Sequence, residues 1–172
     1  MQIVLLSDTH GYFDDRLQEH CRNADEIWHA GDIGSEEIVT QLESMGKVTR
    51  IVYGNIDDAR VRSMTKEDLI FEVDGVRVFM THIGGRPPSY PARVSKIIQD
   101  EKIDVFICGH SHICLAGKNQ RQGNLHLNPG AAGTHGFHKV RTLMRFQIQK
   151  GKITNLEVVE LGPRAVRISD EI

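Results

Sequence analysis

Polar side chains that can bind metal ions follow five apolar runs of the chain, each at the point where the run ends. In chain order they are Asp8, His10, Asp32, Asn55, His82, His110 and His112. In an open α/β sheet, ligands bind in the crevice outside the carboxyl ends of the strands. We therefore expect these seven residues, although distant in sequence, to converge on one edge of a sheet.

The types of these side chains indicate a site for two divalent cations. Carboxylate together with imidazole suits Mn, Fe or Zn better than Ca or Mg. Seven ligands are too many for one ion with an open position, but they suit two ions that share a carboxylate. Such a pair lowers the pKa of a bound water toward about 7 and stabilises the attacking and leaving oxygens of a phosphoryl transfer. This chemistry fits hydrolysis of a phosphate ester.

Two plainer interpretations of the same residues stay open. Any one Asp or His after a strand is often only a turn residue or a helix cap, although coincidence at five strand ends is hard to accept. In addition, Cys108, His110, His112 and Cys114 alternate in the sequence and would share one face of a straight strand. That spacing would favour a single zinc site with thiolate and imidazole ligands. It leaves the other polar residues unexplained.

Short runs rich in Val and Ile predict strands, and apolar stripes between them predict helices. The predicted strands are Ile3–Leu6, Glu26–Ala30, Val48–Tyr53, Leu69–Val73, Val76–Thr81, Ile103–Cys108, Leu125–Leu127, Leu143–Ile148 and Ile153–Leu161. The predicted helices are Asp14–Arg22, Ser35–Met45 and Ala92–Asp100. Alternation of strand and helix in the first half predicts parallel strands. Hairpin turns at Asp74-Gly75 and Lys150-Gly151 predict a second, more antiparallel sheet that includes the last 30 or so residues.

The order and spacing of these residues resemble those of a known family. Asp8-x-His10, Gly31-Asp32, Gly54-Asn55, His82 and Gly109-His110-Ser111-His112 resemble, in order and spacing, the motifs of the calcineurin-like metallophosphoesterase superfamily. The small size, with Asn128-Pro129-Gly130, looks like its compact prokaryotic phosphodiesterase branch. The resemblance implies an α/β fold, a four-layer αββα sandwich in which two mixed β-sheets are flanked by helices.

The resemblance also implies a ligand set and a catalytic role for some of these residues. It assigns one metal to Asp8, His10, Asp32 and His112, and the other to Asp32, Asn55, His82 and His110, with Asp32 bridging. Of these, it gives Asp32, Asn55 and His82 a part in catalysis, and Asn55 a contact with the substrate. Family members use Mn most often, and also Fe, Zn, Ni or Co.

One position departs from the family pattern. Many relatives carry a histidine directly after the asparagine, where it is thought to bind phosphate and protonate the leaving group, but here Ile56 takes that place. Isoleucine cannot transfer a proton, a step commonly worth about 10²–10⁴-fold in rate. We therefore expect a preference for acidic leaving groups, or recruitment of another acid from Asp57, His135 and His138.

Four further side chains have an open role. Arg86 follows His82 and is a candidate for contact with a phosphate, because a guanidinium binds phosphate oxygens through paired donors. His135 and His138 are candidates for the same contact. His29 either orients a ligand or packs within its strand, and the sequence does not decide between the two.

Composition excludes several classes of protein. With 21 Lys and Arg against 23 Asp and Glu, the net charge of −2 argues against a nucleic-acid coat and a polybasic membrane anchor. A nuclease is disfavoured because aromatic residues are only 6% of the chain, and the sequence shows no stripe of basic residues with aromatic residues between them. No apolar stretch approaches the length of a membrane span. Three sparse cysteines, with no signal-peptide pattern, favour the cytoplasm.

These observations predict one metallophosphoesterase domain over residues 1–172, with residues 162–172 as a possible loose tail. The predicted function is hydrolysis of a small phosphate ester, as a phosphodiesterase, through in-line attack by a metal-activated hydroxide at a dinuclear site. The alternative is a non-catalytic protein-binding scaffold of the same fold, like that of a eukaryotic retromer subunit. A homo-oligomer stays open.

Overall fold

The computed structural model describes residues 1–165, which form two five-stranded sheets and four helices. The strands are β1 (Gln2–Leu6), β2 (Glu26–His29), β3 (Val48–Ile51), β4 (Asp68–Val73), β5 (Val76–Thr81), β6 (Val105–Ile107), β7 (Cys114–Lys118), β8 (Leu125–Pro129), β9 (Val140–Gln149) and β10 (Lys152–Pro163). The helices are α1 (Asp15–Arg22), α2 (Glu36–Ser44), α3 (Ala59–Met64) and α4 (Ala92–Asp100). None of these helices is both long and apolar enough to span a bilayer.

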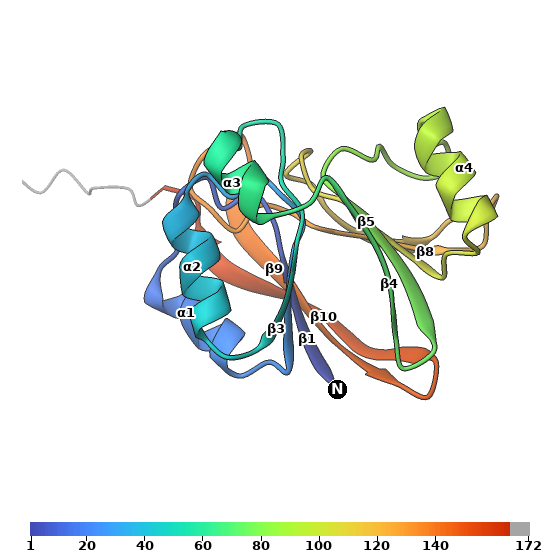
Figure 1. The fold of residues 1–172 in the computed structure, drawn as a ribbon, viewed down its shortest axis with the longest axis horizontal. Helices are drawn as coiled ribbons and strands as arrows, with labels where there is room; N and C mark the ends of the chain where they lie inside the picture. The colour runs from blue at the N-terminus through green and yellow to red at the C-terminus, as the bar shows by residue number, and fades with distance from the viewer. Residues whose placement is uncertain (166–172) are drawn as a thin grey trace, which may run out of the picture.

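The strand order confirms the predicted fold class. The first sheet runs β10-β9-β1-β2-β3 and the second runs β4-β5-β6-β8-β7. In the first, β1, β2 and β3 pair in parallel; in the second, β5, β6 and β8 are parallel while β4 and β7 are antiparallel. Both sheets are therefore mixed, and Figure 1 shows them packed between α1–α3 on one side and α4 on the other.

Alternation along the strands explains why four layers form. Successive side chains of a strand point to opposite faces. Ile3 and Leu5 of β1 therefore enter the core between the sheets, with Trp28, whereas Val4 and Leu6 pack against the helices of the first sheet. A third cluster joins α4 to the outer face of the second sheet. Both faces of each sheet are thus covered.

Three details differ from the sequence-based expectation. The β9–β10 hairpin joins the first sheet beside β1, in the register Gln2↔Gln147, and not the second sheet. Helix α3 was not predicted because only Val61 is buried on it. Strand β7 was not predicted because it is an edge strand with no fully buried side chain. Gly162 and Pro163 belong to β10, and the rest of the proposed tail, beyond residue 165, lies outside the described residues.

A neutral histidine is built into the outer layer of the second sheet. His126 of β8 is 1% exposed, stacks on the Tyr90 ring at 5.7 Å, and has Nδ1 3.2 Å from the Tyr90 hydroxyl. Burial lowers the pKa of His126 to about 4. The folded protein therefore keeps this imidazole uncharged through the range in which an unfolded histidine becomes protonated.

This burial predicts an acid-dependent loss of stability. The pKa of an unfolded histidine is about 6.5. Between about pH 6.5 and 4 the unfolded chain therefore binds a proton at His126 that the folded protein does not bind. As a result, the free energy of unfolding falls as the pH drops through this range. The full loss from this group is about 3 kcal/mol at ~1.4 kcal/mol per pKa unit. Urea unfolding of metal-free protein across this range should give a shallower pH dependence for His126→Gln. Equal slopes for the two proteins would contradict this account.

Candidate metal centre

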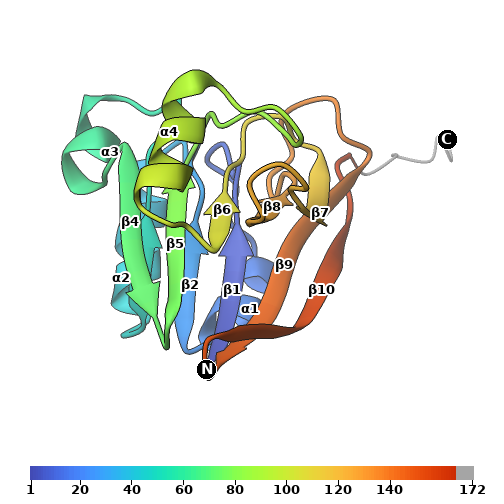
Figure 2. The same ribbon diagram turned by 90° about the vertical axis from the view of Figure 1, so that its right-hand side faces the viewer.

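The loops after β1, β2, β3, β5 and β6 meet at one edge of the two sheets, between their carboxyl ends (Figure 2). Each of these loops carries one or two of the residues expected from the sequence, and the structure gathers the acids and histidines into two groups. One group is Asp8, His10 and His112, and the other is Asp32, His82 and His110; within each, the ligand atoms lie within 4.8 Å of one another. Residues more than 100 positions apart thus share one site, which we call the candidate metal centre.

Asp32 lies between the two groups. Its Oδ2 is 3.6 Å from His10 Nε2 in the first group, and its Oδ1 is 3.2 Å from His82 Nε2 in the second. Within the first group, Asp8 Oδ1 is 3.2 Å from His112 Nε2. One carboxylate therefore presents an oxygen to each group, which is the arrangement that a bridging ligand requires.

Buried atoms without partners show that the centre fits divalent cations. Asp8 Oδ1 and His82 Nε2 are buried and accept or donate no hydrogen bond. The Nε2 atoms of His10 and His112 face each other at 3.3 Å. Leaving buried polar groups unpaired costs free energy, on the order of 1–3 kcal/mol each. A cation on each side of Asp32 would engage these lone pairs.

Hydrogen bonds from the surrounding loops orient the inner side chains. His82 Nδ1 donates to Ala30 O at 2.8 Å, which leaves the Nε2 lone pair facing the centre. The His110 N–H donates to Asp8 Oδ2, and the Ile56 N–H donates to Asp32 Oδ1, both at 3.1 Å. Such partners fix the rotamer and tautomer of a metal ligand.

Electrostatics favour the cation-binding forms of Asp32 and His10. Burial opposes ionisation of Asp32, but the neighbouring His82 imidazole and the Ile56 N–H outweigh it and lower the pKa of this carboxyl. Burial also opposes the charge on His82, but Asp32 and Asp8 outweigh it and raise the pKa of this imidazole. Burial lowers the pKa of His10 despite the attraction of Asp32 and Asp8. These shifts favour the carboxylate form of Asp32 and the neutral form of His10, which are the forms that bind metal.

The backbone at the centre is strained. Asp8, His10, Asp32, His110 and His112 all adopt positive φ, between 48° and 66°. Residues other than glycine rarely occupy this region, and such strain clusters at functional sites. The sharp turns bring side chains from neighbouring positions, such as His110 and His112, into different groups.

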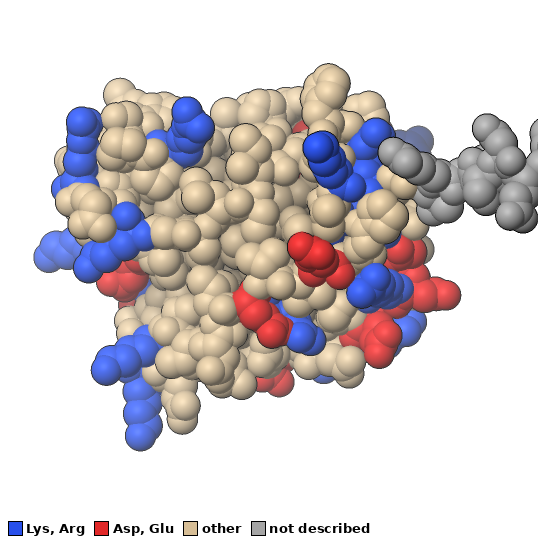
Figure 3. Space-filling model, turned by 180° about the vertical axis from the view of Figure 1, so that it is seen from behind, with Lys and Arg blue, Asp and Glu red and all other residues tan. Residues whose placement is uncertain are grey.

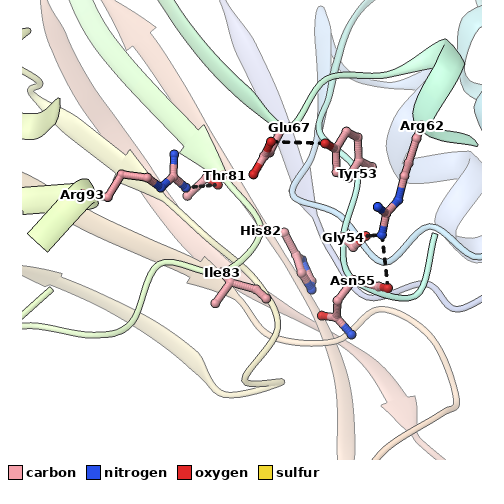
Figure 4. Close-up of a pocket in the computed structure, with 9 residues that line it drawn as sticks. All are labelled: Tyr53, Gly54, Asn55, Arg62, Glu67, Thr81, His82, Ile83 and Arg93. Carbon is pink, nitrogen blue, oxygen red and sulfur yellow. Dashed lines mark hydrogen bonds between the residues drawn. The ribbon is translucent and has the colours of Figure 1, made fainter. Parts of the chain in front are cut away.

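Asn55 lies beside the acids and histidines of the centre. It is exposed and lines two cavities. One, of about 320 Å³, also contains His82 and is shown in Figure 4, where the Asn55 and His82 side chains point to the same side. The other, of about 450 Å³, opens over His10, Asp32, His110 and His112.

Asp57, one of the acids considered from the sequence, is buried and engaged by backbone N–H groups. Its buried carboxylate accepts the N–H groups of Ile33, Gly34 and Gly54, at 3.2, 2.8 and 2.7 Å. These bonds tie the loop after β2 to the loop after β3. Asp57 therefore holds the loops that carry Asp32 and Asn55, a role that the sequence did not indicate.

His29 likewise supports the centre from behind. It is fully buried, and its Nδ1 accepts the Gly31 N–H at 3.2 Å while Nε2 lies 3.0 Å from Thr9 Oγ1. Burial lowers the pKa of His29 to about 4, so it stays neutral. This neutral ring links the β1 and β2 loops, which answers the question that the sequence left open.

The remaining candidates surround the opening. His135 lines the cavity over the centre, and its ring lies 4.9 Å from that of His10. His138 lines the same cavity, but its Nε2 donates to Gly133 O at 3.0 Å and its ring packs on His112. Arg86 lies farther out, on the rim of a third cavity that His110 also lines.

The single zinc site does not form. His110 and His112 belong to different groups, and neither group contains a cysteine. Cys108 is buried, and desolvation raises the pKa of its thiol to about 12, which opposes the thiolate form. The tight loop at Gly109–His112 breaks the alternation that a straight strand would give.

A four-layer α/β sandwich with an Asp- and His-rich centre at its strand ends defines the class of metallophosphoesterases. Residues 1–151 match the calcineurin-like phosphoesterase superfamily domain, and the chain belongs to that superfamily. A protein called "Probable metallophosphoesterase" from Methanothermobacter thermautotrophicus is 30% identical over 76% of this chain and 77% of its own. One of the same description from Mycoplasma pneumoniae is 29% identical over 90% and 94%.

Solved structures share the fold. An archaeal phosphodiesterase superposes with a TM-score of 0.73 at 20% identity, over 94% of this chain and all of its own. Vps29 from Entamoeba histolytica, in complex with zinc, gives 0.70 at 16% identity over 93% and 99% of the two chains. The four-layer arrangement predicted from the sequence is thus that of known phosphoesterase-fold proteins.

Proposed function

We propose that this chain is a phosphodiesterase that hydrolyses a small phosphate ester with two divalent cations. Asp32, with one oxygen toward each three-residue group, is the observation that carries the proposal. The carboxylate and imidazole donors favour Mn, with Fe, Zn, Ni or Co as alternatives. The free cysteines agree with the reducing cytoplasm that we propose as its location.

The proposed ligands form two sets, one for each cation, and Asp32 belongs to both. Asp8, His10 and His112 would hold one cation, His82 and His110 the other, and Asp32 both; Asn55 would complete the second set. When bound, the cations would supply an acidified water and neutralise the charge on the phosphoryl oxygens. Among the chain's own residues, Asp32 and His82 would fix the geometry of the site, and Asn55 would contact the phosphate.

The alternative function is that of a protein-binding scaffold. The Vps29 structures, with TM-scores near 0.70, are the observation that favours it. All seven residues predicted as ligands are nevertheless present here, and six of them lie in two compact groups. That retention supports the enzyme.

An assay of chelator-stripped protein separates these two functions. We expect no hydrolysis of bis(4-nitrophenyl) phosphate without metal, and turnover after addition of Mn²⁺. 4-Nitrophenyl phosphate, a monoester, should be hydrolysed more slowly. A protein that stays inert with Mn²⁺, Zn²⁺, Ni²⁺ and Co²⁺ would favour the scaffold.

His135, and not His138, is the residue that we expect to replace the missing acid at Ile56. The His138 Nε2–H is engaged by Gly133 O, whereas His135 faces the cavity over the centre. His135→Gln keeps a hydrogen-bond donor but cannot release a proton. It should therefore slow hydrolysis of phosphodiesters with poor leaving groups by about tenfold or more, and affect 4-nitrophenyl esters little.

The control for this prediction is His138→Gln, which should leave the dependence on leaving-group pKa unchanged. The measurement is kcat/KM across a series of aryl phosphodiesters. A His135→Gln line parallel to that of the unmodified protein would remove His135 from this role.

A further inference from the structure

A cavity of about 460 Å³ adjoins the candidate metal centre and has mainly apolar walls. Ile83, Ile113 and Leu115 line it and are 50%, 60% and 36% exposed. Burial of a Leu or Ile side chain is favourable, by about 1.5–3 kcal/mol relative to leaving it in water. Three of them around one hollow therefore mark a place where an apolar group can be buried.

This apolar cavity adjoins the cavity over the centre. Both are lined by His110, Ser111 and Ile113. His110 belongs to the group around Asp32. A phosphoryl group held at the centre would consequently direct one of its substituents past His110 and into the apolar cavity.

The polar groups that line the apolar cavity are compatible with an uncharged ring. Among residues 1–165, no Asp or Glu lines it. His126 lies in the wall and stays neutral, because burial lowers its pKa to about 4. Arg86 stands at the rim, and within residues 1–165 its guanidinium forms no ion pair. A guanidinium in this position can cover the face of a planar ring.

One face of the molecule carries an uncharged area. Figure 3 shows the molecule from the side opposite to that of Figure 1, and uncharged residues cover much of the upper central part of this face. Lys, Arg, Asp and Glu side chains lie at its sides and in its lower part.

We propose that the apolar cavity lined by Ile83, Ile113 and Leu115 binds a bulky, ring-sized ester group of the substrate, with Arg86 against its outer side. This inference rests on the proposed function for the position of the phosphoryl group. It names the substrate class as phosphate esters with at least one large apolar or aromatic substituent. A cavity of this volume is within the range of small-molecule sites, about 300–1,000 Å³.

Equilibrium binding tests this proposal without any turnover. Calorimetry on the Mn²⁺-loaded protein would compare benzylphosphonate with methylphosphonate, which share the anionic head and differ in the ring. We expect benzylphosphonate to bind at least about tenfold more tightly, because its ring leaves water. Cyclohexylmethylphosphonate, which has an apolar but non-aromatic ring, shows where the tighter binding comes from. If it binds as tightly as benzylphosphonate, buried apolar area alone accounts for the difference. If it binds more weakly, Arg86 stacks on the aromatic ring.

Matched variants locate the binding. Leu115→Asn, in edge strand β7, should bring the affinity for benzylphosphonate close to that for methylphosphonate. Val158→Asn replaces an exposed apolar residue, 48% accessible, of edge strand β10 and should change neither affinity. Circular dichroism would confirm that both variants fold.

The outcomes separate this inference from the proposed function. Equal affinities of the unmodified protein for the two phosphonates, or no measurable binding of either, would overturn the inference. So would equal effects of Leu115→Asn and Val158→Asn. If the preference for the ring holds but no phosphodiester is hydrolysed, the proposed function fails and the apolar cavity remains a binding site.

Discussion

Replacing Asp32 by Asn is expected to lower kcat/KM for a phosphodiester by about 10³-fold or more. The carboxylate faces both groups, with oxygens 3.6 Å from His10 Nε2 and 3.2 Å from His82 Nε2. An amide offers one weak acceptor and no charge, so the site would lose several kcal/mol of transition-state stabilisation, and each ~1.4 kcal/mol is tenfold in rate. The checks are steady-state kinetics and metal content.

Asp25→Asn is the matched control for this change. Asp25 accepts the Gln2 N–H at 2.7 Å, at the opposite end of β1 from the centre. It should retain full activity and two bound metals, whereas Asp32→Asn should bind fewer. If Asp32→Asn kept more than a tenth of the activity, the bridging role would be wrong.

Gly54→Ala should inactivate the protein nearly as strongly, by about 10²-fold, although Gly54 carries no chemical group. A Cβ at this position would lie 2.0 Å from Asp32 Oδ1 and 2.4 Å from Asp32 N. Since the second contact is with backbone, Asp32 itself must move. A displacement of about 1 Å in a catalytic group can cost about 10²-fold in rate.

Gly117→Ala provides the comparison for Gly54→Ala. No atom lies within 4 Å of a Cβ at Gly117, which is in the edge strand β7, so that variant should behave like the unmodified protein. Kinetics and thermal unfolding would be measured for both. Normal activity in Gly54→Ala would mean that the position of Asp32 is not critical.

The convergence of the candidate residues was predictable because it follows from parallel pairing. Once β1, β2 and β3 run in the same direction, Asp8, Asp32 and Asn55 must emerge at one edge. The period-two pattern of β1 likewise determines which side chains enter each core. Local rules of this kind operate within a few residues of each strand.

Other features depend on contacts between distant segments and could not be predicted. Asp57 looks like a free acid in the sequence, but two of its partners are the N–H groups of Ile33 and Gly34, which are 24 and 23 residues away. The β9–β10 hairpin could extend either sheet, and the choice of β1 is decided by tertiary packing. The difference between His135 and His138 arises from one bond, to Gly133 O.

The most direct test of the account is diffraction from Mn²⁺-loaded crystals with anomalous scattering at the manganese edge. We predict two anomalous peaks per chain, about 3.5–4 Å apart, on either side of the Asp32 carboxylate. Asp8, His10 and His112 should ligate one ion, and His82 and His110 the other. A single ion, or ions that do not contact Asp32, would contradict the dinuclear centre.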